Sequence, residues 1–214
     1  AVLLAAGESR RMGETNKLTL PVAGQALLRR TAETLSHCGL VELVVVVGYQ
    51  QDIARELLRG LPLRIIYNAD FRAGQMTSVS AGLAALERSC RGVMICLSDQ
   101  VLLDAEDIGY IRRGFDRCPT SIMVPVHQGQ RGNPVVLDYS HREAILADPK
   151  NLGCRRLIDN NPELVTAFEM ANDHVLVDVD TPEAYAAVRQ RLGYKDPATT
   201  TIDHTRKENP CQKR

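Results

Sequence analysis

Residues 1–17 have the sequence AVLLAAGESRRMGETNK, a short apolar run followed by a glycine-bounded loop that ends in lysine. Residues 2–4 predict a strand buried on both faces. The small residues after it, Gly7 among them, let the backbone turn close to a ligand. Backbone N–H groups of such a turn, together with cationic side chains, suit a triphosphate. The cationic side chains of this loop are Arg10, Arg11 and Lys17.

Two common glycine loops do not fit these residues. The dinucleotide fingerprint needs further glycines where Ser9 and Met12 stand. The Walker loop needs a glycine at Met12 and a lysine directly after a glycine, whereas three residues separate Gly13 from Lys17. An ordinary surface loop with solvated charges is the competing interpretation.

Apolar segments alternate with helix-period segments along the rest of the chain, which predicts an α/β fold with a mostly parallel, doubly wound, Rossmann-like sheet. Residues 122–126 and 134–137 flank a polar turn and predict a β-hairpin excursion from that alternation. The other expected strands are 41–47, 61–67, 92–97, 164–168 and 174–177. The expected helices are 26–38, 50–59, 105–117, 141–147, 152–160 and one that ends at Leu192.

Composition limits the functional classes. The 214 residues are 44% hydrophobic and 24% charged, which is ordinary for one globular domain, here residues 1–194, followed by a flexible polar tail, 195–214. The formal net charge is zero, so we expect no nucleic acid or membrane partner. Without a spanning apolar run or a secretory signal, a cytoplasmic location is expected. The six cysteines form no C-x-x-C pair and predict free thiols.

Three further segments carry polar side chains where ligands bind. Gly74, Ser78 and Gly82 lie in a polar loop that enters a helix, where hydroxyl groups also serve as plain caps. Asp99 follows the strand 92–97 and is a candidate Mg²⁺ ligand, since Asp104 is better placed to cap the next helix. Asp178 and Asp180 alternate at an expected strand end, so both can face one ion, although Thr181 and Pro182 also make a helix start there. Asp173 is a weaker metal candidate.

The motif of residues 4–13, LAAGESRRMG, with Lys17 after it, resembles the MobA-like nucleotidyltransferases of molybdenum cofactor synthesis. In that family the loop wraps the triphosphate, and the residues matching Arg11 and Lys17 neutralise it. The resemblance therefore implies that Arg11, Lys17 and Asp99 are catalytic. It implies nucleotide contacts at Leu4, Ala5, Ala6, Gly7, Ser9, Arg11, Gly13, Lys17, Gly74, Ser78 and Gly82.

The same resemblance implies a cytidylyltransferase, because that branch has L-A-A-G where guanylyltransferases have L-A-G-G, so Ala6 favours CTP. It implies Mg²⁺ held by Asp99 with Asp178 or Asp180. The acceptor would be molybdopterin, contacted by Arg131, Asn133 and Arg155, and a molybdenum-dependent apoenzyme would receive the product.

This chain departs from the family pattern on the acceptor side. Asn133 replaces the family's histidine, Val101 replaces a proline, and Lys150 and Asn151 stand where the family has glycine and aspartate. Arg131 can equally be a solvated hairpin charge. The alternatives are therefore the same chemistry with GTP or another phosphorylated acceptor, a nucleotide-dependent oxidoreductase of the same family, and a non-catalytic cofactor carrier.

Overall fold

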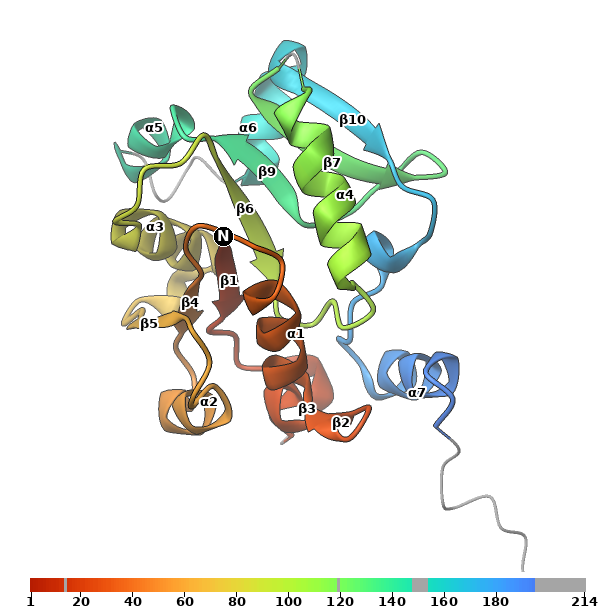
Figure 1. Cartoon of the computed structure of the whole chain (residues 1–214). Helices are drawn as coiled ribbons and strands as arrows, with labels where there is room; N and C mark the ends of the chain where they lie inside the picture. The colour runs from red at the N-terminus through yellow and green to blue at the C-terminus, as the bar shows by residue number, and fades with distance from the viewer. Residues whose placement is uncertain (14, 119, 148–153, 195–214) are drawn as a thin grey trace, which may run out of the picture.

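The computed structural model describes residues 1–13, 15–118, 120–147 and 154–194, without the side chains of residues 154 and 155. Its main sheet has the order β10-β7-β9-β6-β1-β4-β5 (Figure 1). The strands along this order are β10 (Val165–Glu169), β7 (Ile122–His127), β9 (Val135–Asp138), β6 (Gly92–Leu97), β1 (Val2–Ala5), β4 (Val44–Val47) and β5 (Arg64–Tyr67). A short strand, β8 (Gln130–Arg131), pairs with β7, and β2 (Pro21–Val22) pairs with β3 (Gln25–Ala26) apart from the main sheet.

Most neighbouring strands run in parallel. β1 pairs in parallel with β4 and β6, β4 with β5, and β7 with β10. β9 is antiparallel to both β6 and β7, and β8 is antiparallel to β7. The predicted α/β fold with a mostly parallel sheet and a hairpin excursion is therefore confirmed.

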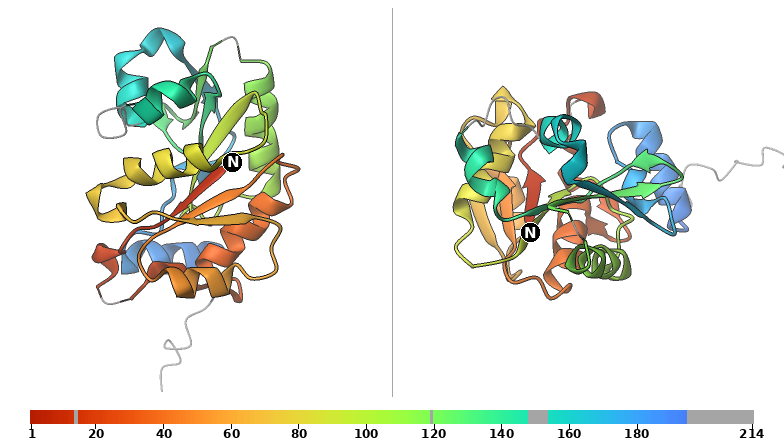
Figure 2. Two further views of the ribbon diagram at one scale, coloured as in Figure 1. Left: turned by 90° about the vertical axis from the view of Figure 1, so that its left-hand side faces the viewer. Right: turned by 90° about the horizontal axis from the view of Figure 1, so that it is seen from above.

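Helices cover both faces of the sheet (Figure 2). On one face the core includes residues from α1 (Leu27–Ser36), α2 (Gln51–Leu57), α4 (Ala105–Asp116) and α7 (Pro182–Arg191). On the other face it includes residues from α3 (Gln75–Ala85), α5 (His141–Ala147) and α6 (Cys154–Asn160). Because both faces are covered, every residue of β1 and β4 is buried.

Helix starts match the capping chemistry of the sequence. Asp104 accepts a hydrogen bond from the backbone N–H of Asp107, and Asp107 accepts one in return from Asp104, which forms a capping box at α4. Thr181 accepts from the N–H of Ala184 at the start of α7. Asp99 is therefore free of a capping role.

The prediction of a strand at residues 174–177 is wrong. His174–Leu176 form a 3-10 turn (η5) instead. The side chain of Asn172 accepts a hydrogen bond from the N–H of His174, and the His174 ring bonds Asp107, so local side chains fix a turn where a strand needs a ladder partner. The segment that carries Asp178 and Asp180 is consequently irregular rather than a strand end.

Among the described residues, no helix has the length and apolar character needed to span a membrane. Cys38, Cys90, Cys96 and Cys118 are free thiols, as predicted. The expected polar tail lies outside the described residues.

Candidate active site

The loop after β1 is held in shape by its own polar groups. Ser9 and Gly13 both have left-handed backbone angles, with φ of 55° and 67°. The backbone N–H of Lys17 donates to Oγ of Ser9 at 3.3 Å, and the side chain of Asn16 accepts from the N–H of Leu18. A side chain added at Gly7 would meet open space. The loop therefore fixes the backbone at Lys17 and leaves room at Gly7.

Lys17 joins two acidic residues that are distant in sequence. Its Nζ lies 2.5 Å from Oδ2 of Asp99 and 2.8 Å from Oδ1 of Asp180. The side chains of Lys17 and Asp99 are only 13% and 14% exposed. Arg11 contacts the second oxygen of Asp180 at 2.6 Å. The structure thus brings together all three residues predicted to be catalytic with one predicted metal ligand.

The charges of this cluster perturb one another. Burial alone would lower the pKa of Lys17, but the neighbouring charges of Asp99 and Asp180 raise it. Burial raises the pKa of Asp178 to about 6, with the charges of Asp99 and Asp180 acting in the same direction. For Asp180, burial opposes ionisation, yet hydrogen bonds from Lys17 and Arg11 lower its pKa. Asp180 is thus the carboxylate in direct contact with cations, whereas for Asp178 burial outweighs the hydrogen bond from Gln100 and the charge of Lys17, which both lower its pKa.

Backbone and amide hydrogen bonds hold the two acidic segments together. The N–H of Val179 donates to the carbonyl of Asp99 at 3.0 Å. Gln100, which is 1% exposed, donates from Nε2 to the carbonyl of Val175 at 2.9 Å. The N–H of Asn133 donates to that same carbonyl at 3.0 Å. The end of β6, the hairpin and the segment before α7 therefore meet at one point.

Two carboxylate oxygens without a hydrogen-bond partner among the described residues suit a divalent cation. Within the described part of the chain, Oδ1 of Asp99 and Oδ1 of Asp178 are buried without a hydrogen-bond partner. Buried carboxylate oxygens without partners are costly unless a cation or donor reaches them, and Mg²⁺ prefers one or two carboxylates. Asp99 and Asp178 therefore have the free ligands, whereas both oxygens of Asp180 already contact cations.

A second acidic group lies outside this cluster. Ligand atoms of Asp104, Asp107 and His174 lie within 4.8 Å of one another. The two aspartates form the capping box of α4, and His174 Nδ1 and Asn172 hydrogen-bond the two oxygens of Asp107. These contacts account for the grouping as helix capping and packing.

α3 and the residue before it carry three of the predicted nucleotide contacts, Gly74, Ser78 and Gly82. Gly74, with φ of 122°, precedes the helix. Ser78 is 4% exposed, and its Oγ accepts from Nδ2 of Asn68 at 3.0 Å. A side chain at Gly82 would lie 2.2 Å from a methyl carbon of Val2, so this glycine lets α3 pack closely on β1. Nucleotide contacts of Gly74, Ser78 and Gly82 stay predictions.

Leu4 and Ala5 end β1 and Ala6 follows it, and the three residues are 7%, 2% and 4% exposed. The carbonyl of Ala6 accepts from the N–H of Tyr49 at 3.1 Å. Nucleotide contacts of these three residues stay predictions.

The predicted acceptor side borders a cavity of about 520 Å³. Arg131 and Asn133 line it from the hairpin, Met76 and Val79 from α3, and Leu97 from the end of β6. The cavity thus lies between α3, which carries predicted nucleotide contacts, and the predicted acceptor contacts Arg131 and Asn133.

The hairpin charge at this cavity is paired with a carboxylate of α6. Nη1 of Arg131 pairs with Oδ1 of Asp159 at 2.8 Å, with both side chains about half exposed. Arg155 belongs to α6, and its side chain lies outside the described residues. The positions of Lys150 and Asn151, where the chain departs from the family pattern, also lie outside them.

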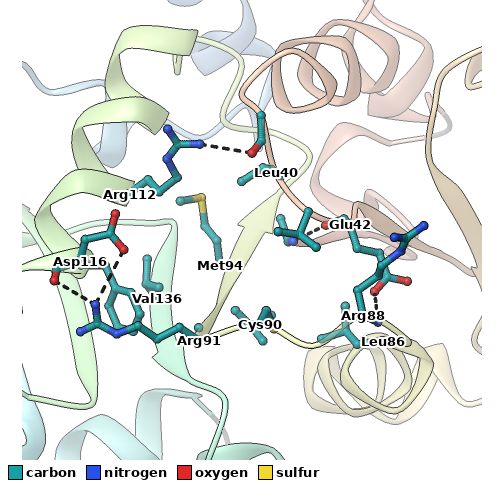
Figure 3. A pocket seen from close by; sticks show the side chains of 16 residues that line it. Leu40, Glu42, Leu86, Arg88, Cys90, Arg91, Met94, Arg112, Asp116 and Val136 are labelled. Atoms are coloured by element: carbon teal, nitrogen blue, oxygen red, sulfur yellow. Dashed lines mark hydrogen bonds and ion pairs between the residues drawn. The ribbon is translucent and has the colours of Figure 1, made fainter.

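Another cavity, of about 360 Å³, opens beside Ala1 and Gly92, at the amino ends of the central strands β1 and β6 (Figure 3). Arg88, Arg91 and Arg112 surround it, with Met94 on its floor. Arg91 donates to the backbone carbonyl of Asp116. Arg112 donates to the backbone carbonyls of Cys38 and Gly39. Neither of the two cavities is lined by Arg11, Lys17, Asp99, Asp178 or Asp180.

Two polar residues of the site were missed by the sequence analysis. Gln100 connects the acidic segments, and Asn68 orients Thr77 and Ser78 at the start of α3. The sequence does contain a signal for Gln100, because this polar residue directly follows the candidate metal ligand Asp99 and precedes three apolar residues. Asn68 directly follows the predicted strand 61–67, and ligands bind at the carboxyl ends of the strands in such sheets.

Comparisons with known proteins identify the family and support the fold. The family model for the MobA-like NTP transferase domain matches residues 1–165. Nicotine blue oxidoreductase of Paenarthrobacter nicotinovorans is 30% identical over 190 residues, which cover 85% of this chain and 92% of that protein. Molybdenum cofactor cytidylyltransferase of Escherichia coli (strain K12) is 23% identical over 192 residues, 89% of this chain and 95% of that protein. A solved nucleotidyl transferase from Methanothermobacter thermautotroptrophicus has a TM-score of 0.75 at 19% identity and covers 89% of this chain and 95% of its own, which is a likeness in fold.

Proposed function

Because the chain belongs to the MobA-like NTP transferase family and is a nucleotidyltransferase, we propose that it transfers CMP from CTP to the terminal phosphate of molybdopterin. The observation that carries this proposal is the ion-pair cluster of Lys17 with Asp99 and Asp180 beside the glycine loop. It combines a cation for the phosphates with carboxylates for a metal. The cytidylyltransferase relative and the residue Ala6 support CTP, and the same relative supports molybdopterin.

In the proposed reaction an oxygen of the acceptor phosphate attacks the α-phosphorus of CTP. A new phosphorus–oxygen bond forms, the bond to the bridging oxygen of the β-phosphate breaks, and pyrophosphate leaves with the electron pair. Arg11 and Lys17 neutralise the charge on the departing pyrophosphate. The cavity at Arg131 and Asn133 holds the acceptor in line, so catalysis consists of positioning and charge neutralisation.

Enzymes that transfer nucleotidyl groups generally use a divalent metal. We assign Mg²⁺ here, with Oδ1 of Asp99 and Oδ1 of Asp178 as its protein ligands, because these buried oxygens have no other partner among the described residues. Mg²⁺ neutralises phosphate charge when it is bound. Asp180 keeps Lys17 and Arg11 in the site through its two ion pairs.

A screen of nucleoside triphosphates tests the proposal. Purified protein, Mg²⁺ and molybdopterin are incubated with CTP, GTP, ATP or UTP, and pyrophosphate release is measured. The product mass identifies the transferred group. We expect CTP to be used best, with product formation that needs both Mg²⁺ and acceptor. Preference for GTP would indicate a guanylyltransferase instead. Absence of turnover with every triphosphate would refute the proposal and favour a carrier role.

A second candidate function is that of an oxidoreductase. The observation that favours it is the 30% identity to nicotine blue oxidoreductase over most of both chains. The glycine loop argues against it, since the dinucleotide fingerprint fails at Ser9 and Met12. Calorimetry with NADPH and with CTP separates the two candidates, because tight NADPH binding without CTP binding would favour the oxidoreductase.

A further inference from the structure

The acidic cluster already contains its own counterions. Three carboxylates, Asp99, Asp178 and Asp180, share two cations, Lys17 and Arg11. Nζ of Lys17 has carboxylate oxygens as its side-chain partners, from Asp99 and Asp180. An ammonium group 2.5 Å from one oxygen of Asp99 repels any divalent cation that approaches the other oxygen of the same carboxylate.

The same two cations are those assigned to the triphosphate. Phosphate oxygens are strong acceptors for lysine and arginine, so a bound triphosphate offers Lys17 and Arg11 new partners. Arg11 is 69% exposed, and Lys17 has a flexible four-carbon stem, so both side chains can turn towards a ligand in the loop. Each ion pair moved from carboxylate to phosphate leaves carboxylate charge that needs another cation.

We propose that Lys17 is an internal counterion of the metal site, so that the site accepts a divalent cation together with a triphosphate and binds the cation weakly by itself. The species taken up is then the metal–nucleotide complex. This inference rests on the proposed function only for the use of a triphosphate. Because coupling between two ligands is reciprocal, the metal also strengthens nucleotide binding by the same factor.

The first experiment uses the wild-type chain. Electron paramagnetic resonance measures the dissociation constant of Mn²⁺ with the protein alone. Calorimetry measures the dissociation constant of CTP with and without Mn²⁺, in the absence of acceptor. We expect weak binding of Mn²⁺ alone and a CTP affinity that rises at least about tenfold when Mn²⁺ is present. A CTP affinity that is the same with and without Mn²⁺ would overturn the proposal.

The second experiment removes the counterion and contains no nucleotide. Lys17→Met keeps most of the side-chain volume and removes the charge. It should bind Mn²⁺ alone at least about tenfold more tightly than the wild type. The matched control is Arg10→Met, which also removes one positive charge from this loop. Arg10 pairs with Glu8 and not with the acidic cluster. The control should leave Mn²⁺ affinity within about twofold of wild type, because exposed charges are screened.

The outcomes of the two experiments are separable from the fate of the proposed function. If Lys17→Met is folded by circular dichroism and binds Mn²⁺ no more tightly than the wild type, the counterion role is wrong. If that variant does not fold, the wild-type experiment alone decides. Failure of CTP turnover with molybdopterin would refute the proposed function and leave the Mn²⁺ result of Lys17→Met unaffected.

Discussion

The ammonium nitrogen of Lys17 lies 2.5 Å from Oδ2 of Asp99, although the two residues are 82 positions apart in the sequence. β1 and β6 are parallel neighbours, with Leu4 opposite Leu97, so the loops that follow both strands leave the sheet at the same edge. The contact between the loop after β1 and Asp99 is therefore a consequence of strand order.

Replacement of Asp99 by asparagine tests its role in turnover. Asparagine has nearly the same volume but cannot supply a charged ligand, so we expect kcat to fall by at least about 10²-fold. Circular dichroism should show an unchanged fold, because Lys17 keeps Asp180 as a partner. The measurement is Mg²⁺-dependent pyrophosphate release with CTP and acceptor, and near-normal kcat would contradict the assignment.

Asp178→Asn and Asp180→Asn should differ in their effects. Oδ1 of Asp178 has no partner among the described residues, whereas Asp180 contacts Lys17 and Arg11. Asp178→Asn should therefore raise the Mg²⁺ concentration for half-maximal activity by about tenfold or more. Asp180→Asn should mainly raise KM for CTP, because Lys17 and Arg11 lose an anchor. Metal activation curves and CTP saturation curves for both variants test this, and the reverse pattern would exchange the two roles.

Much of the fold followed from the sequence because buried strands and helix caps leave local signals. The expected strand 92–97 coincides with β6, and Asp104 caps α4 as its position predicted. The apolar runs 41–47 and 61–67 each overstate their strand, because β4 begins at Val44 and β5 at Arg64. Before β4, Leu43 is buried in a loop and Val41 is 67% exposed, so an apolar run alone does not mark where pairing starts.

The site was less predictable, because its contacts depend on long-range packing. Arg11 and Lys17 stand in a recognisable motif, and so does Asp99, but their meeting with Asp180 depends on the path of the chain before α7. The sequence suggested a strand there, and the structure has the 3-10 turn η5 held by Asn172 and Asp107. Such side-chain hydrogen bonds across distant segments leave no periodic pattern in a sequence.

Two glycines should respond differently to alanine. At Gly132 a new Cβ would lie 2.4 Å from the carbonyl oxygen of Val175, which is backbone and cannot move aside easily. Gly132→Ala should therefore lower the free energy of unfolding by about 1–3 kcal/mol. Gly7→Ala meets open space within the protein, so its stability should stay within about 0.5 kcal/mol of wild type.

Gly7→Ala should instead weaken CTP binding, since the added methyl group enters the space expected to hold phosphate. Urea denaturation measures the stability of both variants, and calorimetry measures CTP affinity. Equal stability losses in the two variants would contradict the packing argument. Unchanged CTP affinity in Gly7→Ala would contradict the position of the phosphates.

Gln100 is the residue whose replacement best tests how the acidic segments are positioned. Its Nε2 donates to the carbonyl of Val175, four residues before Val179, whose N–H bonds the carbonyl of Asp99. Gln100→Met keeps the volume and removes the donor. The segment that carries Asp178 should then shift relative to Asp99, so the Mg²⁺ concentration for half-maximal activity should rise severalfold.

The matched control for this prediction is Gln25→Met. Gln25 also donates from Nε2, to Glu33 at 2.8 Å, but lies in β3 away from the acidic segments. Both variants should lose about 1 kcal/mol of stability, the usual worth of one hydrogen bond. Only Gln100→Met should change the metal activation curve, because only its bond orients a metal ligand. If both variants have the wild-type metal requirement, Gln100 stabilises the fold without positioning the site.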